Sequence, residues 1–332
     1  MAYFHLLLGF FFGLLSFAFP QRDYPDREVN IAIEASPIAA FEIDSPSEKR
    51  FGSLEFRGGL VLKSDYKSFG GISALRMDPD GEHFLALSDR AVWLRGRIVY
   101  QDHQPAGIAD AVAAPVLDDQ GKPAPRLDTE SLTQDGSTLY VGLERTHSIL
   151  RFDYDKKGFP GNGRPIPVPA ELKDLPNNQS LEAIVFVPKK FRLRGTLIAF
   201  SEHGLTEEGN LKAFLIGGPK PGMFSVRRTD GFDISDASML PNGDLLILER
   251  QYSLERGVAM RIRRVRLSAI KPGALVDGPV LIEADVRHQI DNMEAMSMHR
   301  TRSGEIVLTL LSDNNNSPLQ RTVLLQFVLR AK

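Results

Sequence analysis

The chain has 332 residues, with 40 Lys and Arg against 42 Asp and Glu, and it contains no cysteine. Its composition is that of an ordinary globular protein, and a formal net charge of −2 supplies no field that would attract nucleic acid or anionic lipid. The lack of cysteine excludes disulfides, thiolate metal sites and a cysteine nucleophile. Any metal must therefore be held by oxygen or imidazole ligands.

The first 18 residues are apolar apart from a few small or weakly polar positions. They include no Lys, Arg, Asp or Glu, and Ser16 and Ala18 supply the small residues that a signal peptidase reads before Phe19. This pattern predicts a secretory signal peptide over residues 1–18, with an uncleaved membrane anchor as the alternative. We therefore expect a periplasmic or secreted protein that has no stable membrane insertion once the signal is cleaved.

From residue 27 to 332 the chain consists of short β-rich runs cut by turns, without sustained helical periodicity. Apolar runs cover residues 84–87, 139–143, 196–200, 245–248 and 306–311. Four of them follow the turn pairs Asp80-Gly81, Asp135-Gly136, Asn242-Gly243 and Ser303-Gly304, and Gly195 precedes the fifth. Such pairs are typical of β-hairpins, so the pattern indicates an all-β fold.

A second element, upstream of each turn, makes the pattern a repeat. It is a polar or acidic residue followed by a small one, and it starts at Ser73, Glu130, Glu182, Asp236 and Glu294. The starts are 57, 52, 54 and 58 residues apart, a period typical of a propeller blade of four short strands. Because residues 27–63 have room for further strands, we expect one domain over residues 27–332. It would be a six-bladed β-propeller whose N-terminal strand closes the ring.

Acidic residues occupy both ends of four predicted hairpins and the far end of the first, which begins at Ser73. Because neighbouring strands of a blade are antiparallel, the start of one and the end of the next lie at the same edge, and the ring gathers these edges around one channel mouth. The predicted metal ligands are Asp89, Glu130, Glu144, Glu182, Glu202, Asp236, Glu249, Glu294 and Asp313. Carboxylates this close need a counter-charge. Oxygen ligands in an exported chain favour Ca²⁺, with Mg²⁺ or Mn²⁺ as weaker alternatives.

Basic residues directly follow several of these acids. Arg90, Arg145 and Arg250 come after an acid, and His203 follows Glu202. Each arginine can form a structural salt bridge to a neighbouring blade or clamp an anion at the metal site. Residues 261–266 alternate Arg with Ile and Val over much of their length, which predicts a strand with one solvated face and no nucleic-acid patch.

An ordered set of motifs resembles the phytase-like domain family, whose members are described as having esterase-like activity of phytase. The motifs are Phe69-Gly70-Gly71-Ile72-Ser73, Ser88-Asp89-Arg90, Asp128-Thr129-Glu130, Leu143-Glu144-Arg145, Leu248-Glu249-Arg250, Asp291-Asn292-Met293-Glu294, Ser312-Asp313-Asn314-Asn315 and Gln320-Arg321-Thr322. The resemblance runs from about residue 55 to the C-terminus. It implies a propeller-like fold, export, and a phosphoester or ester hydrolase activity.

Three functions stay open at this point. The first is a calcium-dependent phosphomonoesterase acting on a small phosphorylated substrate, in which Glu182, Glu294, Arg145 and Arg250 are catalytic and Arg90, Arg321 and His203 bind the substrate. The second is a calcium-assisted carboxylesterase or lactonase acting on a small ester. The third is a non-catalytic binding propeller that calcium stabilises. The sequence does not define the oligomeric state.

Overall fold

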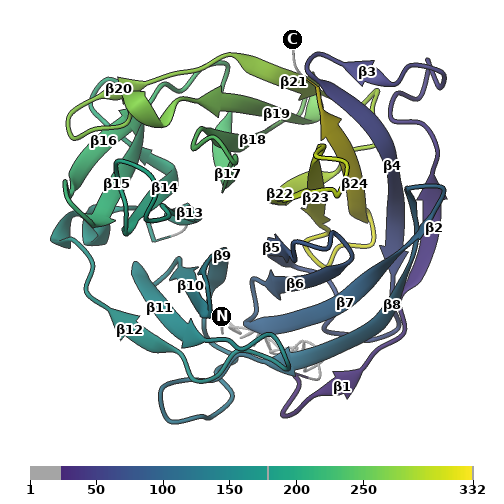
Figure 1. Cartoon of the computed structure of the whole chain (residues 1–332), viewed down its shortest axis with the longest axis horizontal. Helices are drawn as coiled ribbons and strands as arrows, with labels where there is room; N and C mark the ends of the chain where they lie inside the picture. Colours follow the sequence, from purple (N-terminus) through teal and green to yellow (C-terminus); the bar gives the residue numbers. More distant parts are fainter. Residues whose placement is uncertain (1–23, 178, 331–332) are drawn as a thin grey trace, which may run out of the picture.

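The computed structural model describes residues 24–177 and 179–330, so the signal peptide expected at residues 1–18 lies outside the described residues. Five β-sheets stand as blades around a central axis (Figure 1). The predicted all-β propeller is therefore confirmed, with five blades in place of the expected six. In the described part of the chain, no helix combines the length and the apolar character needed to cross a membrane.

We number the blades 1 to 5 by the chain order of their innermost strands, and we give their strands from the channel outward. Blade 1 contains β5 (Ile72–Met77), β6 (His83–Ser88), β7 (Val92–Gln101), β8 (Gln104–Pro115) and β1 (Val29–Asn30). Blade 2 contains β9 (Thr129–Asp135), β10 (Thr138–Leu143), β11 (Ser148–Asp153) and β12 (Arg164–Ile166). Blade 3 contains β13 (Leu181–Phe186), β14 (Thr196–Leu205), β15 (Leu211–Gly217), β16 (Gly222–Val226) and β20 (Leu275–Val276).

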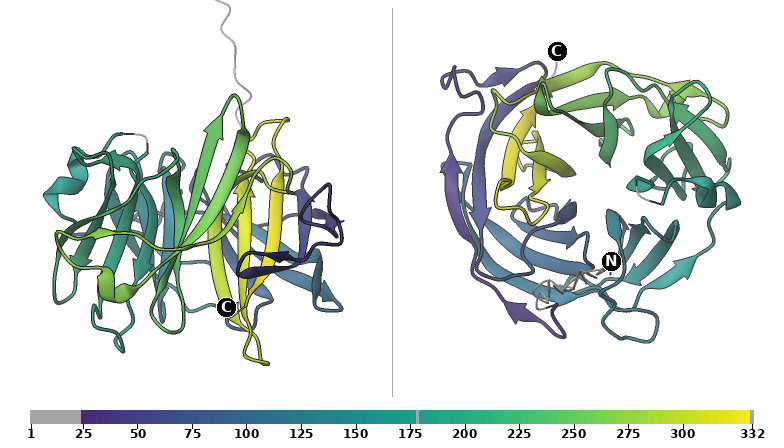
Figure 2. Two further views of the ribbon diagram at one scale, coloured as in Figure 1. Left: turned by 90° about the horizontal axis from the view of Figure 1, so that it is seen from above. Right: turned by 180° about the vertical axis from the view of Figure 1, so that it is seen from behind.

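The last two blades are built in the same way. Blade 4 contains β17 (Asp233–Met239), β18 (Leu245–Ser253), β19 (Gly257–Val265) and β21 (Val280–Ala284). Blade 5 contains β22 (Asn292–Arg300), β23 (Ile306–Asp313), β24 (Thr322–Leu329), β4 (Leu54–Lys63) and β2 (Glu34–Ile38), and β3 (Arg50–Phe51) pairs with β4. Short 3₁₀ helices cover Ala170–Asp174 and Leu267–Ala269. Figure 2 shows that the hairpin of β18 and β19 extends beyond the neighbouring strands on one side of the ring.

The N-terminal segment explains why there are five blades. Its strands form no separate sheet, because β1 extends blade 1 and β2, β3 and β4 join blade 5. Antiparallel pairing of β4 with β24 places Leu60 opposite Leu324, so a strand from the N-terminal segment closes the ring as predicted. Strands β7 and β8 are also long, with 10 and 12 residues, so blade 1 uses more residues than the short strands expected from the repeat.

Apolar side chains fill the spaces between the blades. Between blades 4 and 5, for example, the rings of Phe41 and Phe327 pack edge to face with centroids 5.0 Å apart. Between blades 1 and 2, Trp93 is fully buried and its ring lies 5.6 Å from that of Phe152. Burial of large rings contributes about 2–3 kcal/mol each and holds the blades at fixed positions around the axis.

Candidate metal centre

Each innermost strand has a β-bulge near its start, at the equivalent place in all five blades. The pairing with the second strand skips one residue, which is Ser73, Glu130, Glu182, Ser235 or Glu294. A bulge leaves its extra residue out of the ladder and re-aims the side chain. The bulges thus bring three glutamates into register around one mouth of the channel.

The second strand of each blade adds another residue at this mouth. The last strand pair before each bulge is, for example, Leu181 with Ser201 or Met293 with Ser312. The residue that follows this pair on the second strand is the one at the channel mouth. In blades 1 to 5 these residues are, in order, Asp89, Glu144, Glu202, Arg250 and Asp313. Together with the bulged glutamates they make seven carboxylates and one guanidinium, which we call the acidic ring.

Two predicted metal ligands in blade 4 lie outside this ring. Asp236 follows the bulge, one residue beyond the position of Glu182, and it occupies the place of Ala183. Its Oδ1 accepts a hydrogen bond from the Ala237 amide at 2.7 Å and its Oδ2 accepts one from the Met296 amide at 2.6 Å. Asp236 therefore joins blade 4 to blade 5 and does not share the cluster.

Glu249 is likewise one residue out of register with the other acids. It pairs with Ile234 ahead of the bulge, and its fully buried carboxylate contacts two arginines of the neighbouring strand β19. Arg261 Nε donates to it at 2.6 Å and Arg263 Nε at 2.8 Å. Because both arginines are only 2% exposed, this is an internal ion network of blade 4, and the expected solvated face of this strand is buried at these two positions.

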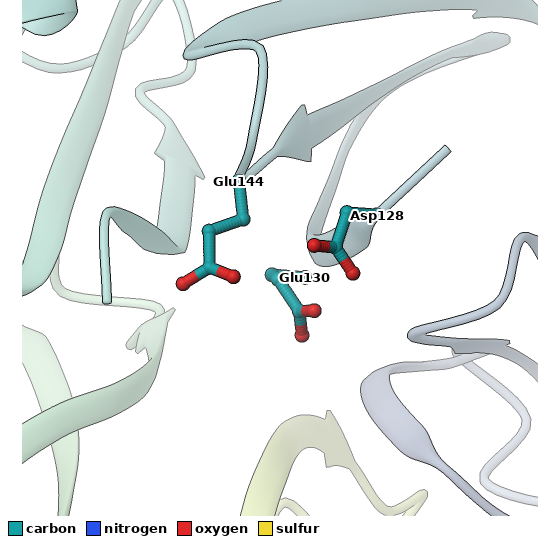
Figure 3. A group of neighbouring side chains, drawn as sticks. All are labelled: Asp128, Glu130 and Glu144. Atoms are coloured by element: carbon teal, nitrogen blue, oxygen red, sulfur yellow. The ribbon is translucent and has the colours of Figure 1, made fainter. Parts of the chain in front are cut away.

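Two overlapping groups of three carboxylates, made of Asp128 and four residues of the acidic ring, have the geometry of a cation site. Asp128, Glu130 and Glu144 form one group, shown in Figure 3 with the three carboxylates near one another, and Glu144, Glu182 and Glu202 form the other. In each group, one carboxylate oxygen from each of the three residues lies within 4.8 Å of the other two. Oxygens on opposite sides of a bound Ca²⁺ are about 4.6–5.2 Å apart, so the spacing and the all-oxygen donor set fit this cation.

The backbone holds Glu144, the residue shared by the two groups. Its amide donates to the Asp128 carbonyl at 2.9 Å, and its Oε1 accepts from the Ser180 amide at 3.2 Å and from the Gln179 amide. Blades 2 and 3 are linked through these contacts. The carboxylate is thus fixed between the two groups before any cation binds.

Several carboxyl groups of the ring have a raised pKa. Burial, reinforced by the neighbouring Glu202 and Glu294, raises the pKa of Glu182 well above its usual range. Burial also raises the pKa of Glu130, and the negative charge of Glu182 raises it further. The pKa of Glu202 rises to about 7 and that of Asp313 to about 6, in both cases chiefly because of burial. The ring therefore has excess negative charge that a bound cation would compensate.

Arg250 is the positive charge that the ring already contains. Its Nη2 donates to Glu202 at 2.7 Å, and its Nη1 lies 3.0 Å from Glu294 and 2.7 Å from the Asn292 Oδ1. Burial disfavours the charged guanidinium, but the carboxylates of Glu294 and Glu202 outweigh this effect and raise the pKa of Arg250. The side chain thus links blades 3 and 5 from blade 4.

Two of the remaining predicted basic residues lie near the ring. Arg145 Nε forms a 2.6 Å ion pair with Asp128, and its side chain is 69% exposed. Arg90 is exposed at the rim, with its Nε 3.9 Å from Asp89. Both side chains are exposed to solvent at the mouth.

The other two predicted basic residues are held outside the two carboxylate groups. Arg321 donates from Nη1 to the Gln289 Oε1 at 3.0 Å and from Nη2 to the Ile290 carbonyl at 3.1 Å. His203 Nδ1 lies 3.1 Å from Asp233. The structure therefore separates the four expected partners of an anion into two at the mouth and two anchored beside it.

Two residues of the site were not among the predicted ligands. Asp128 belongs to the first carboxylate group, and Asn292 contacts both Arg250 and Glu294, to which its Nδ2 donates at 2.8 Å. Both stand two residues before a bulged glutamate, inside the motifs Asp128-Thr129-Glu130 and Asn292-Met293-Glu294. That shared spacing is the signal that could have identified them.

Comparison with known proteins adds a family and several similar folds. The family described as "Phytase-like: Esterase-like activity of phytase" matches residues 67–316, which is more than half of the chain. In the comparison with curated proteins, none matched.

Three solved structures resemble this one in fold at low sequence identity. Glutaminyl cyclase from Myxococcus xanthus is 10% identical, with 78% of this chain and 91% of that chain covered and a TM-score of 0.42. The PQQ-bound aldose sugar dehydrogenase from Streptomyces coelicolor is 11% identical (90% and 99% covered, TM-score 0.45). The WD40 domain of Toxoplasma gondii coronin is 9% identical (91% and 87% covered, TM-score 0.43).

Proposed function

The chain belongs to this phytase-like family, and we propose that it is an exported, metal-dependent hydrolase of phosphomonoesters. The observation that carries the proposal is the acidic ring with the adjoining Asp128, because two groups of three carboxylates there share Glu144. Arg250 contacts Glu202 and Glu294 of the ring. In a structural ion network each carboxylate has cationic partners, as Glu249 has in Arg261 and Arg263. The acidic ring has seven carboxylates and one guanidinium, so its carboxylates are in excess.

Calcium is the cation that these residues would hold best. Glu144 would be the common ligand, with Asp128 and Glu130 on one side and Glu182 and Glu202 on the other. Carboxylates with adaptable geometry favour Ca²⁺ over Mg²⁺, which demands a tight octahedron. When bound, the cation supplies positive charge that polarises a phosphoryl oxygen and stabilises the charge developing on it.

The arginines of the mouth would bind and orient the substrate. Arg250 is fixed by Glu202 and Glu294 and faces the same ring, so it can donate to a phosphate oxygen without rearranging. Arg145 is more exposed and is held by one ion pair to Asp128, so it can turn toward the phosphate or the leaving group. Glu294 acts through Arg250, whose position it fixes together with Asn292.

Hydrolysis of carboxylic esters or lactones is the second candidate, because the family's description names an esterase-like activity. The same mouth would then polarise a carbonyl oxygen, and the arginines would have no dianion to bind. Substrate preference consequently separates the two activities.

The experiment compares phosphate release from an aryl phosphate with hydrolysis of the matching aryl acetate by the purified mature protein. Each assay is run with Ca²⁺, after chelation, and after Ca²⁺ is restored, in the native chain, in Glu144→Gln and in the exposed control Glu207→Gln. We expect phosphate release that requires Ca²⁺ and is lost in Glu144→Gln alone. Ester cleavage without phosphate release would select the second candidate. Calcium-dependent thermal stabilisation with no turnover would overturn both and indicate a binding propeller.

A further inference from the structure

The channel has a second cavity at the mouth opposite the acidic ring. All five innermost strands start at the ring, so their C-terminal ends meet at the far mouth, and Gln134 lies about 13 Å along β9 from Glu130. A cavity of about 190 Å³ lies there, lined by residues that include Arg76, Thr133, Gln134, Lys190, Ser238 and Met298. One water needs about 10–15 Å³ of such space, so the cavity has room for a group of several heavy atoms.

The charge of this cavity is opposite to that of the acidic ring. Among the described residues that line it, Arg76 and Lys190 are charged and none is acidic. Lys190 is held at its edge, since its Nζ donates to the Pro241 carbonyl at 3.4 Å and lies 4.9 Å from the centre of the Phe191 ring. The hydroxyls of Thr133 and Ser238 add polar groups to a wall that is otherwise largely apolar.

Arg76 is a partly buried arginine with an unpartnered donor atom. Its Nε is buried and has no hydrogen-bond partner within residues 24–177 and 179–330. The acids that act on it electrostatically, Asp236 and Asp78, are engaged elsewhere. The oxygens of Asp236 accept the amides of Ala237 and Met296, and Asp78 pairs with Lys156 at 3.2 Å. A guanidinium whose Nε is buried without a hydrogen-bond partner is costly, and an anionic ligand would offset that cost.

We propose that this far-mouth cavity binds a small phosphate-bearing oxyanion through Arg76 and Lys190, independently of the acidic ring. Arginine matches the oxygen pairs of a phosphate group with two parallel donors, and the lysine adds a second positive charge at the cavity edge. Inorganic phosphate and the phosphate group of a small ester share this chemistry. The site needs no metal, which distinguishes it from the proposed catalytic mouth.

The test is calorimetric titration of the full protein with inorganic phosphate after chelation of divalent metal, at constant ionic strength set by chloride. We compare the native chain with Arg76→Gln, Arg76→Lys and Lys190→Gln, and with Arg302→Gln as an exposed arginine at the same end of the fold. We expect one phosphate site in the native chain and in Arg302→Gln. Affinity should fall at least tenfold in Arg76→Gln and by a smaller factor in Arg76→Lys and Lys190→Gln.

Two results would overturn the proposal. One is the absence of phosphate binding to the chelated native chain, and the other is unchanged affinity in Arg76→Gln. The fluorescence of Trp93 during urea unfolding shows whether each variant is folded, and Lys190→Gln keeps the test decisive if Arg76→Gln does not fold. A parallel titration with glycerol 3-phosphate distinguishes a site for phosphate esters from a site for the free ion. Binding of both ligands assigns the site to phosphate esters, and binding of inorganic phosphate alone assigns it to the free ion. Neither result depends on the proposed hydrolase activity.

Discussion

Without divalent metal, the protein should lose stability as the pH rises from about 4.5 to 7. The carboxyl of Glu202 has its pKa raised from 4.5 to about 7, chiefly by burial, so the folded state holds this proton more tightly than the unfolded chain does. Its stabilising contribution is complete below pH 4.5 and is lost as the pH passes 7. At 1.36 kcal/mol per pKa unit, the titration of Glu202 lowers the free energy of unfolding by about 3 kcal/mol over this pH range.

Urea unfolding of the chelated protein, followed by the fluorescence of the single buried tryptophan Trp93, measures this loss. With a slope of about 3 kcal/mol per molar urea, the native midpoint should fall by about 1 M between pH 4.5 and 7.5 from Glu202 alone. Glu202→Gln should remove that part of the pH dependence, the exposed control Glu207→Gln should keep it, and Ca²⁺ should restore the midpoint at pH 7.5. A native midpoint that stays constant or rises over this range, or an equal slope in Glu202→Gln, would refute the reasoning.

Three further variants probe separate parts of the structure. Glu249→Gln leaves Arg261 and Arg263 without their buried carboxylate, so urea unfolding should show a loss of about 3–5 kcal/mol with unchanged calcium affinity in the folded protein. Gly71→Ala should cost at least about 1–2 kcal/mol in the same assay, because Gly71 has φ of +62° and an added Cβ would lie 2.2 Å from the Asp89 Oδ1. Arg250→Gln should raise KM for a phosphomonoester at least tenfold, because the substrate loses a phosphate-binding side chain. A calcium titration of this variant should show no loss of metal affinity, because the guanidinium that competes with Ca²⁺ for Glu202 is gone. Weaker calcium binding would contradict the substrate-binding role of Arg250.

The propeller could be predicted from the sequence because its turns and strands recur locally. Turn pairs such as Asp135-Gly136 and the polar residues that begin the inner strands repeat with a period near 55, and both features reflect backbone requirements within one blade. The number of blades depends on a non-local fact. The pattern predicts that an N-terminal strand closes the ring, but it does not show that residues 54–63 pair with residues 322–329 in an existing blade and so leave no sixth one.

The acidic ring was predicted in blades 1, 2, 3 and 5 and misplaced in blade 4 for a physical reason. The triplets Leu143-Glu144-Arg145 and Leu248-Glu249-Arg250 are identical in sequence, yet Leu143 and Glu249 are the residues that pair just ahead of the bulge. A shift of one residue moves a strand side chain to the opposite face. Arg250 therefore reaches the channel and Glu249 enters the blade, where Arg261 and Arg263, two residues apart on β19, face it.

Closure of the ring by β4 also determines when the fold can become complete. The pairing of Leu60 with Leu324 joins segments that are far apart in the chain, so the contact order is high and assembly of blade 5 is slow compared with formation of a local hairpin. During synthesis, β4 must wait for β24 to emerge, and until then it presents an unpaired edge that another chain can capture. Blade 5 is consequently the stage of biogenesis most exposed to misassembly, although it is among the most extensively paired sheets of the finished molecule.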